Sequence, residues 1–192
     1  PSYFPDEFHI GYVTNGVHLP TWASRNWQKF FISNLGSDIY REQANPEFWR
    51  KIQNLPDQLI WLQRQKAKAS FIKLLKKKIQ TDLTRRQENP RIIFDTLELI
   101  DESALYIGFA RRFATYKRAN LLFTNLEKLA ILLNDPKKPL RLIFSGKAHP
   151  NDKPGQDLIK QVFEISRMPQ FLGRIIFIEN YDLHVARKLI SG

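Results

Sequence analysis

Four cationic side chains lie within one stretch of eight residues, at Arg111, Arg112, Lys117 and Arg118. Arginine presents a planar fork of N–H donors that matches the oxygens of a phosphate, and lysine supplies a compact point charge. The stretch follows a short apolar run and precedes an amphipathic pattern, which predicts a loop between a strand and a helix. We therefore expect a phosphate-binding loop whose helix amides also favour an anion. The alternative is a solvated basic turn.

A second loop with a similar setting is Ser145–Pro150, which follows another apolar run. Its Gly146 lets the backbone approach a ligand or a neighbouring helix closely, and Lys147 adds a cation. The glycine spacing and the Lys-Ser/Thr pair of a P-loop are missing, so this segment alone is read as a turn.

Two other positions carry polar groups of low specificity. In the segment Glu179–Asp182, Asp182 is a candidate helix cap, and Tyr181 either packs in the core or stacks on a planar ring. Near the start, Asn15 offers an amide, although an Asn-Gly pair is also a common turn.

The elements that must position these loops are three buried strands and the helices between them. The strands are expected at 104–109, 140–145 and 174–179, and the helices at 117–134, 155–166 and 183–190. The strands start roughly 35 residues apart, the spacing of repeated βαβ units. Such units form an α/β fold with a parallel, Rossmann-like sheet, helices on both faces, and ligands at the carboxyl ends of the strands.

Residues 1–103 are expected to form a mainly helical lead-in to this sheet, and residues 104–192 the βαβαβα half of a doubly wound domain. The lead-in comprises a short strand at 8–13 and helices at 22–34, 46–52 and 57–86, while 91–100 fits a strand and a helix equally well. The apolar stripe of the longest helix is expected to comprise Leu59, Leu62, Ile72, Leu75, Ile79 and Leu83.

The composition favours a globular domain with an anionic partner. Of the 192 residues, 43% are hydrophobic, which excludes a disordered chain, and the net charge is +11. Cysteine is absent, and the four histidines lack the spacing of metal ligands, so no metal is expected. No apolar run approaches the roughly 18 residues that span a bilayer. The lysines of the 57–86 helix lie all round its apolar stripe, which disfavours a nucleic-acid surface.

Four segments in the same order resemble the α-glucan (glycogen, starch and maltodextrin) phosphorylases. They are Thr14–Trp22, Arg111–Arg118, Ser145–Pro150 and Glu179–Asp182. The resemblance implies the first half of the C-terminal domain of a GT-B glycosyltransferase. It also implies a cytoplasmic enzyme, often a dimer, in which inorganic phosphate releases glucose 1-phosphate from an α-1,4-glucan with retention of configuration. The missing initial methionine and the abrupt end agree with a piece of a longer protein.

The resemblance also assigns roles to the cations. Arg112 and Lys117 are expected to hold the substrate phosphate, and Arg111, where the family usually has a lysine, to lie near the phosphate of a pyridoxal phosphate cofactor. Tyr181 is expected to lie against that cofactor. Two adjacent phosphates repel each other strongly, so a reaction of this kind requires fixed cations.

On the sugar side, the resemblance implies that Tyr116 contacts a hydroxyl and that Asn15 contacts the 6-hydroxyl. It places the cofactor lysine outside this chain, so the chain alone is expected to be inactive. Two alternatives remain open. One is a nucleotide-sugar glycosyltransferase of the glucan synthase type on the same fold. The other is a non-catalytic module that binds glucan or nucleic acid.

Overall fold

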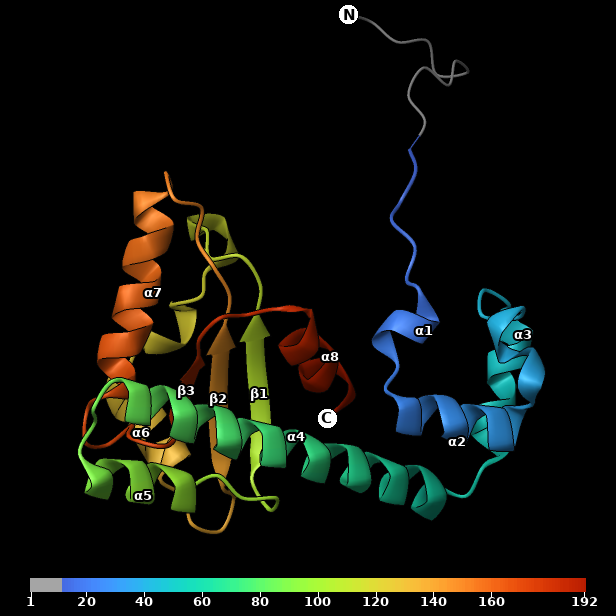
Figure 1. Cartoon of the computed structure of the whole chain (residues 1–192), viewed down its shortest axis with the longest axis horizontal. Coiled ribbons are helices and arrows are strands. Elements are labelled where there is room, and N and C mark those ends of the chain that lie inside the picture. The colour runs from blue at the N-terminus through green and yellow to red at the C-terminus, as the bar shows by residue number, and fades with distance from the viewer. Residues whose placement is uncertain (1–11) are drawn as a thin grey trace, which may run out of the picture.

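The computed structural model describes residues 12–192, which fold into a helical lead-in followed by a three-stranded sheet (Figure 1). Of the strand expected at 8–13, residues 8–11 lie outside the described residues, and residues 12 and 13 belong to no strand. The helices of the lead-in are α1 (Leu19–Trp22), α2 (Arg25–Leu35), α3 (Pro46–Arg50), α4 (Asp57–Arg85) and α5 (Pro90–Glu98).

The sheet consists of β1 (Leu105–Ala110), β2 (Leu140–Ser145) and β3 (Ile175–Ile178), all parallel and in that spatial order. The register pairs Leu105 with Leu140 and Leu142 with Ile175. β2 is central and almost wholly buried, which agrees with its mostly apolar sequence, although Arg141 and Ser145 are buried with it. The expectation that the first strand is buried was wrong: within residues 12–192, β1 pairs with β2 alone, and its Leu105 and Ile107 are exposed.

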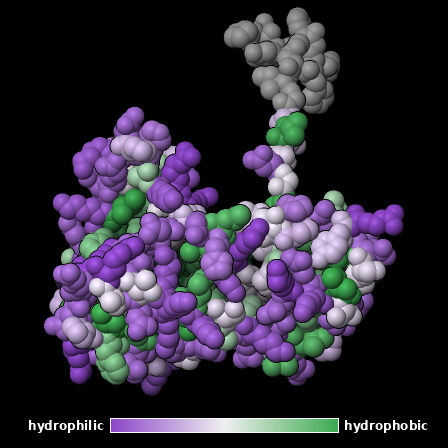
Figure 2. All heavy atoms as spheres, in the orientation of Figure 1, coloured by the Kyte–Doolittle hydropathy of each residue, from purple (hydrophilic) through white to green (hydrophobic). Residues whose placement is uncertain are grey.

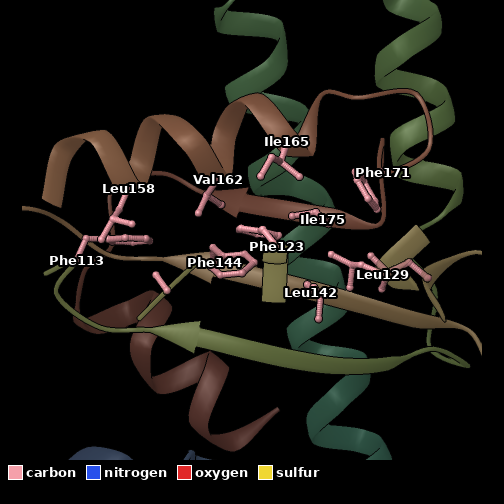
Figure 3. Packing of buried hydrophobic residues seen from close by; sticks show 12 residues of the cluster. Phe113, Phe123, Leu129, Leu142, Phe144, Leu158, Val162, Ile165, Phe171 and Ile175 are labelled. Carbon is pink, nitrogen blue, oxygen red and sulfur yellow. The ribbon is translucent and has the colours of Figure 1, made fainter. Parts of the chain in front are cut away.

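Helices cover both faces of the sheet, as predicted. On one face, α6 (Leu126–Leu133) and α7 (Lys153–Ser166) enclose a core with the completely buried Phe113, Val162 and Phe171 (Figure 3). On the other face, α4 and α8 (Leu183–Ser191) enclose a second core. The chain is therefore an α/β protein with a parallel, Rossmann-like sheet.

The longest helix, α4, does not bury all of its predicted stripe. Its buried apolar residues are Ala67, Phe71, Ile72, Leu75 and Ile79, whereas Leu59 and Leu62 are 38% and 53% exposed. At 3.6 residues per turn, Leu59 lies about 140° round the helix from Ile72. The prediction was wrong for these two leucines because the first turns of α4 extend past the sheet toward α2 and α3 (Figure 1).

A third, smaller core joins α2, α3 and the 3₁₀ turns next to them, Ser37–Tyr40 and Lys51–Asn54. Aromatic rings contribute to it and extend it: Phe31 lies 5.4 Å from both Trp49, within this core, and Trp27, outside it, measured between ring centroids. Among residues 12–192, no helix has the length and apolar character needed to cross a bilayer. Figure 2 shows hydrophilic side chains over most of one face, with smaller hydrophobic patches among them.

Residues 91–100, which fitted both a strand and a helix, form most of α5. The side chain of Asn89 accepts a hydrogen bond from the backbone N–H of Arg91, and Pro90 occupies the first turn. An asparagine cap followed by proline is a common helix start, because proline lacks only an N–H that would be unpaired there.

The helix expected at 117–134 starts later than predicted. Two 3₁₀ turns, Thr115–Lys117 and Leu121–Thr124, precede α6, which begins at Leu126. Arg118 has a left-handed backbone with φ 50°, which ends the first turn, and the side chain of Asn125 caps α6.

Candidate functional site

Three loops leave the carboxyl end of the sheet together, because parallel strands end at the same edge (Figure 1). Residues 111–118 form the cationic loop after β1, residues 146–152 the loop after β2, and residues 179–182 the loop after β3. The structure thus confirms that the three segments singled out by sequence are neighbours.

The first two loops continue the pairing of their strands. The backbone N–H of Arg111 donates to the carbonyl of Ser145 at 3.2 Å, and that of Phe113 to the carbonyl of Lys147 at 3.0 Å. The side chain of Phe113 is completely buried, with its ring 5.3 Å from that of Phe109. The cationic loop is therefore anchored through its backbone and through one aromatic side chain.

Most of the cations at this end of the sheet are open to solvent, and none has a carboxylate partner among the described residues. Arg111, Arg112, Arg118 and Lys147 are exposed, Lys117 is half-buried, and no ion pair within residues 12–192 involves any of the five. The Nζ atom of Lys117 lies 5.6 Å from the centroid of the exposed Tyr116 ring. Arg112, Tyr116 and Lys117 thus share one loop at the carboxyl end of the sheet.

The two carboxylates of the third loop are already engaged elsewhere. Glu179 forms ion pairs with Arg86 and with Arg85, the latter at 2.7 Å. Asp182 accepts a hydrogen bond from the backbone N–H of Val185 at 2.8 Å and so caps α8, as predicted. Neither carboxylate forms an ion pair with the cationic loop, so neither neutralises its charges directly.

Tyr181 joins the third loop to the first. Its hydroxyl donates to the carbonyl of Ala110 at 3.5 Å, and its ring packs at the border of the core between the sheet, α4 and α8. Tyr181 therefore lies next to the strand end from which Arg111 emerges. The two residues assigned to a cofactor by resemblance are brought together, while their role stays a prediction.

Arg111 also lines a cavity of about 490 Å³ between the free edge of β1, α4 and α8. Arg64 and Lys68 on α4 contribute two further cations to its wall, together with Phe71 and Tyr106. Burial lowers the pKa of Lys68, and the neighbouring Arg64 adds to this effect. The wall therefore combines three cations with aromatic and aliphatic side chains.

Asn15 is not brought to this edge. It is exposed, and residues 12–18 have no regular secondary structure and extend from α1 away from the sheet (Figure 1). Its predicted contact with a sugar hydroxyl stays a prediction. The expected contribution of helix amides at Lys117 was wrong, because 3₁₀ turns separate that residue from α6.

Two residues that position the loop carried only weak sequence signals. Phe113 lies among charged and small residues, so it belongs to no apolar run, yet it is the anchor of the loop. Gly146 was read as a turn residue, although a Cβ atom there would lie 2.1 Å from the carbonyl oxygen of Arg111. The start of α7, which approaches the loop, was indicated in the sequence by Pro154 and Gly155 after Asp152.

No family model matches the chain. The chain is 42% identical over 189 residues to a maltodextrin phosphorylase of Thermococcus litoralis, covering 97% of this chain and 22% of that protein. It is 34% identical over 183 residues to a glycogen phosphorylase of Aquifex aeolicus, covering 95% and 26%. It is 36% identical over 188 residues to a glycogen phosphorylase of Mycobacterium bovis, covering 98% and 21%. The chain thus spans about a fifth to a quarter of the length of these relatives.

Proposed function

The chain belongs to the maltodextrin and glycogen phosphorylase family, and we propose that its cationic loop binds the phosphate that cleaves an α-1,4-glucan. The reaction releases the terminal glucosyl unit as glucose 1-phosphate with retained configuration. The chain spans about a fifth to a quarter of the length of these relatives, so the activity belongs to an enzyme of which this chain forms a part.

In this proposal, Arg112 and Lys117 hold the phosphate oxygens. The guanidinium of Arg112 offers two parallel N–H donors, and the ammonium of Lys117 supplies a point charge. Glycosyl transfer passes through an oxocarbenium-like state, and fixed cations stabilise the phosphate charge as the glycosidic bond breaks. The observation that carries the proposal is that five cations lie on two neighbouring loops at the carboxyl end of the sheet, none of them in an ion pair within residues 12–192.

We assign the sugar side of the site to Tyr116 and Asn15. Tyr116 is 76% exposed and adjoins Lys117, so its hydroxyl is available to a sugar bound beside the phosphate. Asn15 lies in an exposed stretch without regular structure and would reach the site only through a different placement of that stretch.

The pyridoxal phosphate that the family implies would lie against Arg111 and Tyr181. The pairing fits the group chemically, because an arginine charge suits its phosphate and an aromatic ring suits its planar body. When bound, the cofactor supplies acid–base chemistry through its phosphate, next to the substrate phosphate. Arg111 would hold that charge, and Tyr181 would orient the ring. No lysine of this chain is assigned to the cofactor.

An assay of the enzyme that contains this segment tests the proposal. With maltooligosaccharide and inorganic phosphate we expect release of glucose 1-phosphate. A nucleotide-sugar glycosyltransferase on the same fold would instead elongate the glucan from a nucleotide sugar and release no glucose 1-phosphate. Glucan binding without either reaction would support a non-catalytic module and reject the proposal.

A further inference from the structure

The backbone of Gly146 touches the backbone of the cationic loop. A Cβ atom at this position would lie 2.1 Å from the carbonyl oxygen of Arg111 and 3.1 Å from Cδ2 of Phe113. Its φ of 153° is also one that L side chains rarely adopt. Glycine is therefore the residue that allows the loop after β2 to lie directly against the loop after β1.

A second glycine makes a similarly close contact with the cationic loop from the side of α7. Gly155, in the first turn of α7, would carry a Cβ atom 2.6 Å from the carbonyl oxygen of Phe113 and 2.7 Å from Oδ2 of Asp152. That carboxylate also accepts a hydrogen bond from the backbone N–H of Gly155 at 3.0 Å, so it has little freedom to move away. The start of α7 thus lies against the same short piece of the cationic loop.

The part of the cationic loop that the two glycines contact is also fixed by its own residue Phe113. The Phe113 ring is completely buried, and its backbone N–H donates to the carbonyl of Lys147 at 3.0 Å. Arg112 precedes this fixed point directly, and Lys117 follows four residues later in a 3₁₀ turn. The side chains that would meet phosphate are exposed, while the backbone that carries them is clamped.

We propose that Gly146 and Gly155 are positioning residues, which hold the cationic loop in the geometry that binds phosphate; this rests on the proposed function. Charges fixed in advance of ligand binding need no reorganisation when the ligand arrives. A displacement of about 1 Å in such a group can cost about 100-fold in rate. An added methyl group at either glycine forces a displacement of that order on Arg111 or Phe113.

The test compares Gly146→Ala and Gly155→Ala with Gly108→Ala, a control in β1 where a Cβ atom would meet nothing within 4 Å. Inorganic phosphate is titrated into this chain and followed by backbone NMR. We expect about tenfold or greater weakening of phosphate binding in the two loop variants and less than twofold in the control. Equal affinities in all three variants would overturn the proposal. If Gly146→Ala does not fold, Gly155→Ala carries the same expectation.

Hydrogen exchange of the Arg111 and Phe113 amides gives a readout that needs no phosphate. We expect faster exchange of both amides in Gly146→Ala and unchanged exchange in Gly108→Ala. If the unsubstituted chain fails to bind phosphate, the proposed function fails, and the exchange rates still decide whether Gly146 positions the loop. In the longer enzyme, Gly146→Ala should raise the KM for phosphate and leave the KM for glucan unchanged; a parallel rise in both would indicate a structural role alone.

Discussion

Arg112 and Lys117 are separated by four residues, and the structure explains how both stay near one edge of the sheet. Phe113 fixes the loop in the core directly after Arg112, and the 3₁₀ turn at Thr115–Lys117 folds the chain back on itself. The left-handed backbone of Arg118 ends that turn. A non-glycine residue in this conformation is unfavourable by about 1 kcal/mol, and such residues often cluster at functional sites.

The substitution Tyr116→Phe removes a single hydroxyl from an exposed ring next to Lys117. We expect turnover to fall about tenfold or less and discrimination among sugars to weaken, because the lost group contacts substrate and bears no charge. The measurement is kcat/KM for a glucosyl substrate and for an epimer that changes one hydroxyl. Unchanged discrimination would remove Tyr116 from the site.

Among the elements, the strands could be predicted from their apolar residues, including β1, which has no fully buried residue, whereas features set by long-range contacts could not. β2 matched its prediction of 140–145 because it is buried on both faces. The prediction that a helix begins at residue 117 was wrong, because Arg118 adopts a left-handed backbone conformation. Arginine as a residue type does not indicate this conformation in the sequence. The three loops of the site could be placed from topology alone, since parallel strands end together. The contact of Gly146 with Arg111 depends on the register between β1 and β2, so it could not be predicted from the sequence.

β1 and α4 meet at Tyr106, and this contact predicts a pH dependence of stability. Burial raises the pKa of the Tyr106 phenol well above its ordinary value, and the nearby Asp101 adds to the effect. Above about pH 10, the unfolded chain loses this proton while the folded chain keeps it. The free energy of unfolding should therefore fall with rising pH, by about 1.4 kcal/mol per pH unit from this group.

The variant Tyr106→Phe isolates that contribution. It should be less stable by about 1 kcal/mol at neutral pH, because the hydroxyl donates to the carbonyl of Asp101 at 2.9 Å. Above pH 10 the difference from the unsubstituted chain should shrink and then reverse. Urea unfolding between pH 7 and 11 measures it. Burial lowers the pKa of Lys68, whose Nζ atom lies 5.7 Å from the centroid of the ring at position 106, but this lysine is present in both chains. Parallel stability curves would show that Tyr106 does not keep its proton.

The hydrophobic core between the sheet, α6 and α7 both stabilises the whole fold and anchors the cationic loop. Phe113 and Phe171 are both completely buried in the core between the sheet, α6 and α7, and Figure 3 shows them at opposite ends of it. Phe113 lies at the end with the cationic loop, whereas Phe171 precedes β3 at the other end. Substitutions at these two residues therefore distinguish the contribution of the core to stability from the contribution of the loop anchor to phosphate binding.

We expect Phe113→Ala and Phe171→Ala each to lower the free energy of unfolding by about 3–5 kcal/mol through cavity formation. Only Phe113→Ala should also weaken phosphate binding, since only that residue anchors the cationic loop. Urea unfolding and phosphate titration on both variants provide the comparison. Equal losses of phosphate affinity would mean that the site responds to general destabilisation and not to its anchor.

The most direct test of the account is the rate of glucose 1-phosphate release by the enzyme that contains this segment, before and after Arg112→Ala. Lys138→Ala is the matched control, because Lys138 is exposed and precedes β2 at the opposite edge of the sheet. Loss of a positioned charge should lower turnover by about 10²- to 10³-fold, with the control unchanged. Turnover near that of the unsubstituted enzyme would contradict the assignment of this edge as the phosphate site.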